Sequence, residues 1–149
     1  MTEITPELHK KLGISLFNQV WDLIDKADRS EDETESMINA AHASLYHWMQ
    51  VGEPVNFARG EWQVSRVYSL AGRAEPALHH AANSLRICLQ NSIGDFDLAF
   101  AYEAMARAYA LAGNKQKTKE NVDLAMAASG SIREKEDRDY LLRELNTIK

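Results

Sequence analysis

Two stretches of this chain, 41 residues apart, carry nearly the same seven-residue sequence. Residues 66–72 are Arg-Val-Tyr-Ser-Leu-Ala-Gly and residues 107–113 are Arg-Ala-Tyr-Ala-Leu-Ala-Gly, so five of the seven positions are identical. A weaker echo at an offset of 40 places Ser44 over Ser84. Units of this length recur where helix pairs stack, because one pair cannot bury its apolar face alone. The repeat therefore predicts a chain of stacked helical hairpins.

Glycine and proline are scarce, which leaves few places for turns. The 149 residues contain seven glycines and three prolines, and between these breaks apolar residues recur at the three- and four-residue spacing of an α-helix. Capping residues and helix-ending glycines delimit seven predicted helices. The helices are expected to start at Pro6 and Ser30 and to cover residues 55–71, 75–92, 96–112, 116–129 and 131–148. A capping box of Ser131 and Glu134 should open the last one. The sequence thus predicts an all-α fold.

The spacing of aromatic and small residues around the repeated glycines resembles the tetratricopeptide repeat family. Its pattern has a tyrosine four positions before a helix-ending glycine and small residues five and twelve positions after it. The second pair matches at Tyr68, Gly72, Ala77 and Ser84. The third pair matches less fully, at Tyr109, Gly113, Thr118 and Ala125. The resemblance implies a right-handed α-α superhelix of about three helix pairs with a C-terminal capping helix.

This resemblance also implies how the chain is divided. A single domain over residues 1–149 would contain a divergent first pair (5–50), a second pair (55–92), a third pair (96–129) and a capping helix (131–148). Two features depart from the family. The repeat exceeds the usual length of about 34 residues, which implies longer helices, and Glu61 stands where a tryptophan is expected.

Composition excludes several classes of partner. The chain carries 17 basic and 22 acidic residues, a net charge of −5 without a basic stripe, so we expect no nucleic-acid partner. An apolar run of roughly 18 residues and a leader segment are both lacking, so we expect no membrane partner. The single cysteine, Cys88, cannot form an intramolecular disulfide and has apolar neighbours. We therefore expect a buried thiol and a cytoplasmic location.

The resemblance implies a concave face, lined by the first helix of each pair, which in this family binds extended peptides. On the predicted third helix, Arg59, Trp62 and Arg66 share one side, and Phe100, Glu103 and Arg107 do so on the fifth. The looser equivalents on the first helix are Gln19, Asp22 and Lys26. Guanidinium groups at matching heights suit a carboxylate. The expected ligand-binding residues are Arg59, Trp62, Arg66, Glu103 and Arg107.

These residues indicate a non-enzymatic protein–protein interaction module. Its ligand would be a peptide or protein segment, possibly acidic or C-terminal, held in the arginine- and aromatic-lined groove. Under this hypothesis, alanine at Arg66 and Arg107 should abolish partner capture and leave the melting temperature nearly unchanged. No catalytic residue is expected, because the sequence contains no glycine-rich phosphate loop, nucleophile elbow or HExxH pattern.

Three alternatives remain open at this point. The arginines could simply pair with Glu61, Glu103 and Asp97 inside the fold, with Trp62 and Phe100 as packing residues. A small-molecule-binding protein or hydrolase could use Glu61 and nearby groove residues, and the chain could instead be a structural homodimer. The spacing of the histidines, such as His42 and His47 five positions apart, does not suit a metal site, so we expect neither metal nor cofactor.

Overall fold

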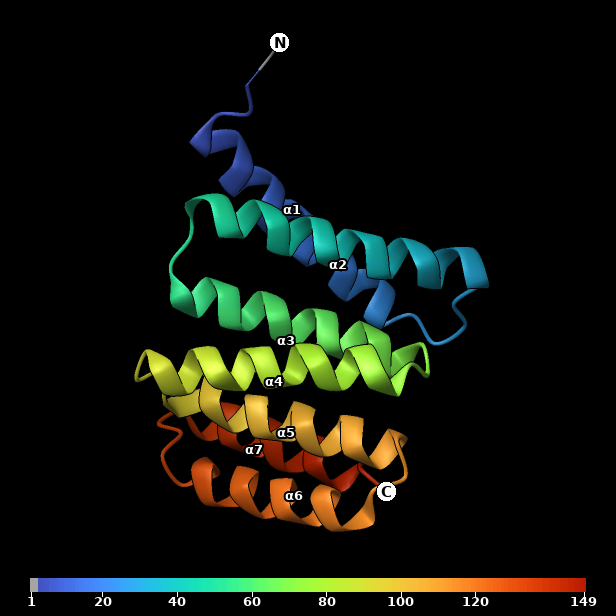
Figure 1. Cartoon of the computed structure of the whole chain (residues 1–149), viewed down its shortest axis with the longest axis vertical. Helices are drawn as coiled ribbons and strands as arrows, with labels where there is room; N and C mark the ends of the chain where they lie inside the picture. Colours follow the sequence, from blue (N-terminus) through green and yellow to red (C-terminus); the bar gives the residue numbers. More distant parts are fainter. Residues whose placement is uncertain (1–2) are drawn as a thin grey trace.

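The structure is a computed structural model that describes residues 3–149, so Met1 and Thr2 of the predicted domain lie outside it. The described residues form seven α-helices and no strand (Figure 1). The helices are α1 (Pro6–Ile24), α2 (Glu31–Val51), α3 (Pro54–Leu70), α4 (Ala74–Gln90), α5 (Asp95–Leu111), α6 (Lys115–Ser129) and α7 (Lys135–Asn146). The all-α prediction is confirmed.

Local side-chain chemistry fixes the starts of the first two helices. Thr5 Oγ1 accepts a hydrogen bond from the Leu8 backbone N–H at 3.1 Å, and Pro6 follows it in the first turn. Ser30 and Glu33 form the predicted capping box. The Glu33 N–H donates to Ser30 Oγ at 3.1 Å, and the Ser30 N–H donates to Glu33 Oε1 at 3.0 Å. These bonds satisfy backbone donors that the first helical turn leaves free.

The two repeated segments end their helices in the same way. Gly72 and Gly113 have φ angles of 76° and 80°, in the left-handed region that favours glycine. In the first copy, the Arg73 N–H donates to the Tyr68 carbonyl at 2.9 Å. In the second copy, the Asn114 N–H donates to the Tyr109 carbonyl at 3.0 Å. The sequence repeat is therefore also a repeat of backbone conformation at these two positions.

The last helix begins later than expected. The predicted capping box of Ser131 and Glu134 does not form; Glu134 is the residue that precedes α7, and the helix starts at Lys135. The side chain of Ile132 is only 2% exposed and packs with Leu141 and Leu145 of α7. The segment after α6 therefore turns to bury Ile132 before the helix starts.

Packing between the helices places them in two layers. Each of α1 to α6 packs against the next helix, and contacts also join α1 to α3, α3 to α5 and α5 to α7. Within residues 3–149, the backbones of α2 and α4, and those of α4 and α6, do not approach each other in this way, although the side chains of His42 on α2 and His80 on α4 meet at 5.3 Å between ring centroids. Figure 1 shows α1 behind α2 and α7 behind α5 and α6. This pairing of neighbouring helices is compatible with a helical repeat, and it brings the odd-numbered helices side by side.

Buried serines join the two helices of the first and second pairs. Ser44 of α2 donates to the Gly13 carbonyl of α1 at 2.7 Å, and Ser84 of α4 donates to the Ala58 carbonyl of α3 at 2.9 Å. These are the two serines that the offset of 40 aligns. Cys88 is buried, as predicted, and burial raises the pKa of its thiol to about 11. Within the described part of the chain, none of the helices has the length and apolar character needed to cross a membrane.

Candidate functional site

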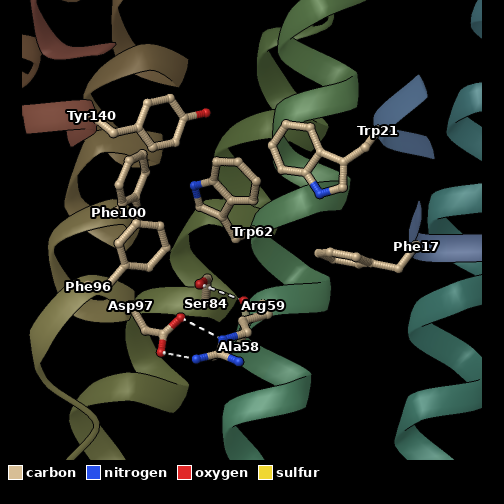
Figure 2. A pocket seen from close by; sticks show the side chains of 10 residues that line it. All are labelled: Phe17, Trp21, Ala58, Arg59, Trp62, Ser84, Phe96, Asp97, Phe100 and Tyr140. Atoms are coloured by element: carbon tan, nitrogen blue, oxygen red, sulfur yellow. Dashed lines mark hydrogen bonds and ion pairs between the residues drawn. The ribbon is translucent and has the colours of Figure 1, made fainter. Parts of the chain in front are cut away.

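A cavity of about 220 Å³ opens where the odd-numbered helices meet. We call it the aromatic pocket, because six of its ten lining residues have aromatic rings. Its lining residues are Phe17, Trp21, Ala58, Arg59, Trp62, Ser84, Phe96, Asp97, Phe100 and Tyr140. Helices α1, α3, α5 and α7 all contribute (Figure 2), and α4 adds Ser84 alone. The pocket therefore exists only when these helices are assembled.

Ring-to-ring contacts run across the pocket from α1 to α7. Trp62 of α3 is central, stacked on Trp21 at 5.7 Å between ring centroids and edge-on to Phe100 at 5.8 Å. Phe100 in turn contacts Tyr140 of α7 at 5.4 Å. Figure 2 shows Trp62 between Trp21 and Phe100. Offset and edge-to-face pairs of this kind stabilise beyond the area that they bury, so the aromatic wall is held in place by its own members.

One ion pair closes an end of the pocket. Arg59 Nε and Nη2 donate to the two carboxylate oxygens of Asp97 at 2.9 and 3.0 Å, an arrangement in which both groups are bidentate (Figure 2). The hydrogen bond to Asp97 raises the pKa of Arg59 above its ordinary value. Because Asp97 is neutralised in this way, the pocket has no uncompensated charge from this pair.

A second cavity, of about 320 Å³, lies further along α3 and α5, beside the C-terminal segment that follows α7. We call it the arginine pocket. It is lined by Arg66, Ser69, Leu70, Arg107, Ala110, Leu111, Thr147, Ile148 and Lys149. The two arginines here already bind groups of the chain itself. Arg66 Nη2 donates to Glu144 Oε1 at 2.7 Å, and Arg107 Nη2 donates to Thr147 Oγ1 at 2.8 Å.

Glu103 lies beneath these arginines. Its side chain is 1% exposed, and its Oε1 atom accepts a hydrogen bond from Arg107 Nε at 2.7 Å. Arg66 Nη1 lies 3.8 Å from the same oxygen. Glu103 Oε2, Arg66 Nε and Arg66 Nη1 are buried without a hydrogen-bond partner in the described chain. This cluster is charged, covered by the C-terminal segment, and only partly satisfied.

The structure thus places the five predicted site residues on one side of the molecule but not in one cavity. Arg59 and Trp62 line the aromatic pocket, Arg66 and Arg107 line the arginine pocket, and Glu103 is buried below the second pair. Each arginine also has an internal partner, as the packing alternative expected. Asp97 binds Arg59, and Glu103 binds Arg107, but Arg66 binds Glu144, which that alternative did not include.

Sequence reasoning missed the other half of the aromatic pocket. On α1 it selected Gln19, Asp22 and Lys26, whereas Phe17 and Trp21 line the cavity. It also missed Phe96 of α5 and Tyr140 of α7. A signal was available for two pairs, because Phe17 and Trp21, like Phe96 and Phe100, are four residues apart and so share a helix face. Burial and the neighbouring Glu144 raise the pKa of Tyr140.

Glu61, His42 and His80 lie elsewhere, between α2, α3 and α4, whereas His9 and His47 face each other at the α1–α2 contact, with 2.9 Å between their Nδ1 atoms. His80 Nδ1 lies 2.6 Å from Glu61 Oε2, and the His80 ring stacks on Tyr68 at 5.9 Å. Tyr68 is hydrogen-bonded to His42 Nε2 at 2.8 Å. None of these residues lines the aromatic or the arginine pocket. Among residues 3–149 there is no group of three or more His, Cys, Asp and Glu side chains that could hold a metal ion.

Comparison with known proteins gives no match to a family model, to a curated protein or to a solved structure. The resemblance to tetratricopeptide repeats therefore rests on the residues quoted above. The structure itself shows that the described residues are all-helical and that neighbouring helices pack in pairs.

Proposed function

We propose that this protein is a non-enzymatic interaction module, built as a tetratricopeptide-like superhelix, that binds a segment of a partner protein along its odd-numbered helices. We place it in the cytoplasm, with no nucleic-acid or membrane partner. The observation that carries the proposal is the aromatic pocket, to which α1, α3, α5 and α7 all contribute lining residues. Aromatic side chains in a concave site are the usual anchors of protein interfaces.

The spacing of the two pockets suits an extended segment. Phe100 and Arg107 are seven residues apart on α5, and Tyr140 and Thr147 have the same separation in the C-terminal segment. Seven helical residues span about 10 Å, and an extended chain in the polyproline II conformation advances about 3.1 Å per residue and places every third side chain on the same face. One partner segment would therefore reach both pockets with side chains about three residues apart.

The aromatic pocket is the main anchor in this proposal, and the arginine pocket is secondary. Arg66 and Arg107 already bind Glu144, Glu103 and Thr147. An acidic group or C-terminal carboxylate of the partner would have to share or replace these partners. Lys149 also lines the arginine pocket and supplies a positive charge, which supports an acidic residue of the partner at this end.

The hydrolase alternative has less support. Glu61 is bonded to His80 at 2.6 Å and is absent from the lining of both pockets. A catalytic carboxylate needs a substrate-sized space next to it. The Glu61–His80 pair instead joins α3 to α4, which is a structural role.

Selection of peptides on the immobilised protein tests the proposal. A random library of displayed peptides is enriched on the wild-type chain, and the selected peptides are titrated against two variants. Trp62→Leu alters the aromatic pocket. Trp48→Phe is the matched control, because Trp48 lies at the α1–α2 contact next to Gly13 and outside the aromatic pocket.

The selected peptides should bind wild type and Trp48→Phe with similar affinity and should bind Trp62→Leu on the order of tenfold more weakly. Circular dichroism serves to check that both variants are folded. Equal binding to all three proteins would place the ligand elsewhere on the molecule and contradict the proposal. Light scattering on the same samples tests the homodimer alternative, which predicts twice the monomer mass.

A further inference from the structure

The size of the aromatic pocket limits what it can hold. A cavity of about 150 Å³ with apolar walls accepts one benzene molecule, and sites for drug-sized ligands begin at about 300 Å³. The aromatic pocket, at about 220 Å³, lies between these values. It therefore has room for one ring with its first substituent, as in a single side chain, and not for a larger ligand.

The walls of the pocket favour a ring over an aliphatic group. Trp62 is edge-on to Phe100, with an angle of 87° between their planes, and Phe96 lies 4.5 Å from Phe100 between ring centroids. A ring that enters this space can form the same edge-to-face contacts with its neighbours. Such contacts add to the gain from buried area, whereas a leucine side chain gains from the area alone.

The polar groups in the wall define the rest of the ligand. Among the ten lining residues, the hydrogen bonds made by side chains are those from Arg59 to Asp97 and from Ser84 to the Ala58 carbonyl (Figure 2). The indole N–H groups of Trp21 and Trp62 thus have no partner within the lining, and an indole nitrogen is a donor only. Since Arg59 neutralises Asp97, this pair gives the pocket no net negative charge that would favour a cation over a neutral group. The best complement is a neutral ring flanked by hydrogen-bond acceptors.

We infer that the aromatic pocket is a subsite for one uncharged aromatic side chain, phenylalanine or tyrosine, of the partner segment. The backbone carbonyls that flank this residue accept hydrogen bonds from the free indole N–H groups at the rim. This inference rests on the proposed function and adds the identity of the anchor residue. The subsite is separate from the arginine pocket and from any acidic residue bound there.

Single amino acids with an acetylated amino group and an amidated carboxyl group test the inference directly. The chain has three tryptophans, Trp21, Trp48 and Trp62, so the ¹⁵N-labelled protein gives three indole N–H signals in an NMR spectrum, which single Trp→Phe variants assign. N-acetyl-phenylalaninamide and N-acetyl-tyrosinamide are titrated against N-acetyl-leucinamide. The aromatic amides should shift the signals of Trp21 and Trp62, leave Trp48 unchanged, and bind roughly threefold to tenfold more tightly than the leucine amide.

Two variants keep the result interpretable. Trp62→Leu should lose the preference for the aromatic amides, with the Trp21 signal as the remaining reporter. Trp48→Phe should retain the preference. Equal or tighter binding of the leucine amide, shifts centred on Trp48, or no shift with any amide would each overturn the inference.

The peptide selection described above separates this inference from the proposed function. Selected peptides that share a phenylalanine or tyrosine, and lose binding when it is changed to leucine, support both. Selected peptides that bind the pocket through aliphatic side chains alone keep the proposed function and overturn the aromatic subsite. If the library yields no binder while the aromatic amides still shift Trp21 and Trp62, the proposed function is wrong and the ring specificity of the pocket stands.

Discussion

Arg66 links the arginine pocket to the stability of the fold. Its side chain is 15% exposed, and it lies between the carboxylates of Glu144 and the buried Glu103. The sequence hypothesis expected Arg66→Ala to leave the melting temperature nearly unchanged. The structure predicts instead a loss of about 2–4 kcal/mol of unfolding free energy, because Glu103 would stay buried with less compensation. Urea denaturation at neutral pH measures this loss.

Arg86→Ala is the matched control for this prediction. Arg86 is exposed and donates only to Asn83, three residues away on α4. Its replacement should change the unfolding free energy by less than about 0.5 kcal/mol. A similar small effect for Arg66→Ala would show that the cluster beneath α7 is not part of the stabilising core.

His42 makes the stability of the fold depend on pH. Burial, followed by the positive charge of His80, lowers the pKa of His42 from 6.5 in the folded chain. The unfolded chain therefore takes up a proton first as the pH falls through about 6.5, and this uptake favours unfolding. We expect the unfolding free energy to decrease between pH 7.5 and pH 5.5.

The variant His42→Gln should show a smaller decrease over the same range, measured by urea denaturation at both pH values. Part of the decrease should remain, since burial and His9 also lower the pKa of His47. Glu33 does not contribute over this range, because the hydrogen bond from Lys26 helps to lower its pKa to about 2. An identical slope in wild type and variant would contradict the assignment to His42.

At the scale of helices, three glycines that were all predicted to end a helix differ in backbone conformation. Gly72 and Gly113 end α3 and α5 with positive φ angles, whereas Gly130 ends α6 with φ of −62°, in the right-handed region. An alanine is strained at the positive φ angles of Gly72 and Gly113 but not at the negative φ angle of Gly130. We expect Gly113→Ala to cost about 1 kcal/mol of unfolding free energy and Gly130→Ala to be neutral or slightly stabilising. Thermal unfolding of the two variants side by side measures the difference, and equal effects would contradict it.

The helices could be predicted from sequence because their starts and ends depend on near neighbours. Ser30 is three residues from its partner Glu33, and Tyr68 is five residues from Arg73, whose N–H donates to the Tyr68 carbonyl. The start of α7 could not be predicted. Ile132 lies outside the helix and packs against Leu141, and this contact depends on the tertiary structure. A capping-box pattern alone does not show whether an apolar residue within it, here Ile132, is buried in the core by tertiary contacts.

The aromatic pocket was predicted only in part, for the same reason. Trp62 contacts Trp21, Phe100 contacts Trp62, and Tyr140 contacts Phe100. These partners are about 40 residues apart in the chain, close to one repeat. Periodicity placed Arg59 and Trp62 on one face of a helix, but it could not show which residues of α1 and α7 that face would meet.

Over the whole molecule, the odd-numbered helices combine two features with different roles. The arginine cluster is bonded to the C-terminal segment, with Arg107 Nη2 donating to the Glu144 carbonyl at 3.0 Å, and it contributes mainly to stability. The aromatic pocket keeps unused indole donors and a volume of about 220 Å³. Substitutions in the pocket should therefore change binding more than stability, and substitutions in the cluster should do the reverse.

Chemical-shift mapping of a selected peptide on the labelled protein tests the central claim that α1, α3, α5 and α7 together form a binding face. The largest shifts should fall on residues that line the aromatic pocket, including Trp21, Trp62 and Tyr140, with Trp48 and the exposed residues of α4 unaffected. Shifts concentrated on α2, α4 and α6, with the pocket signals unchanged, would contradict the claim.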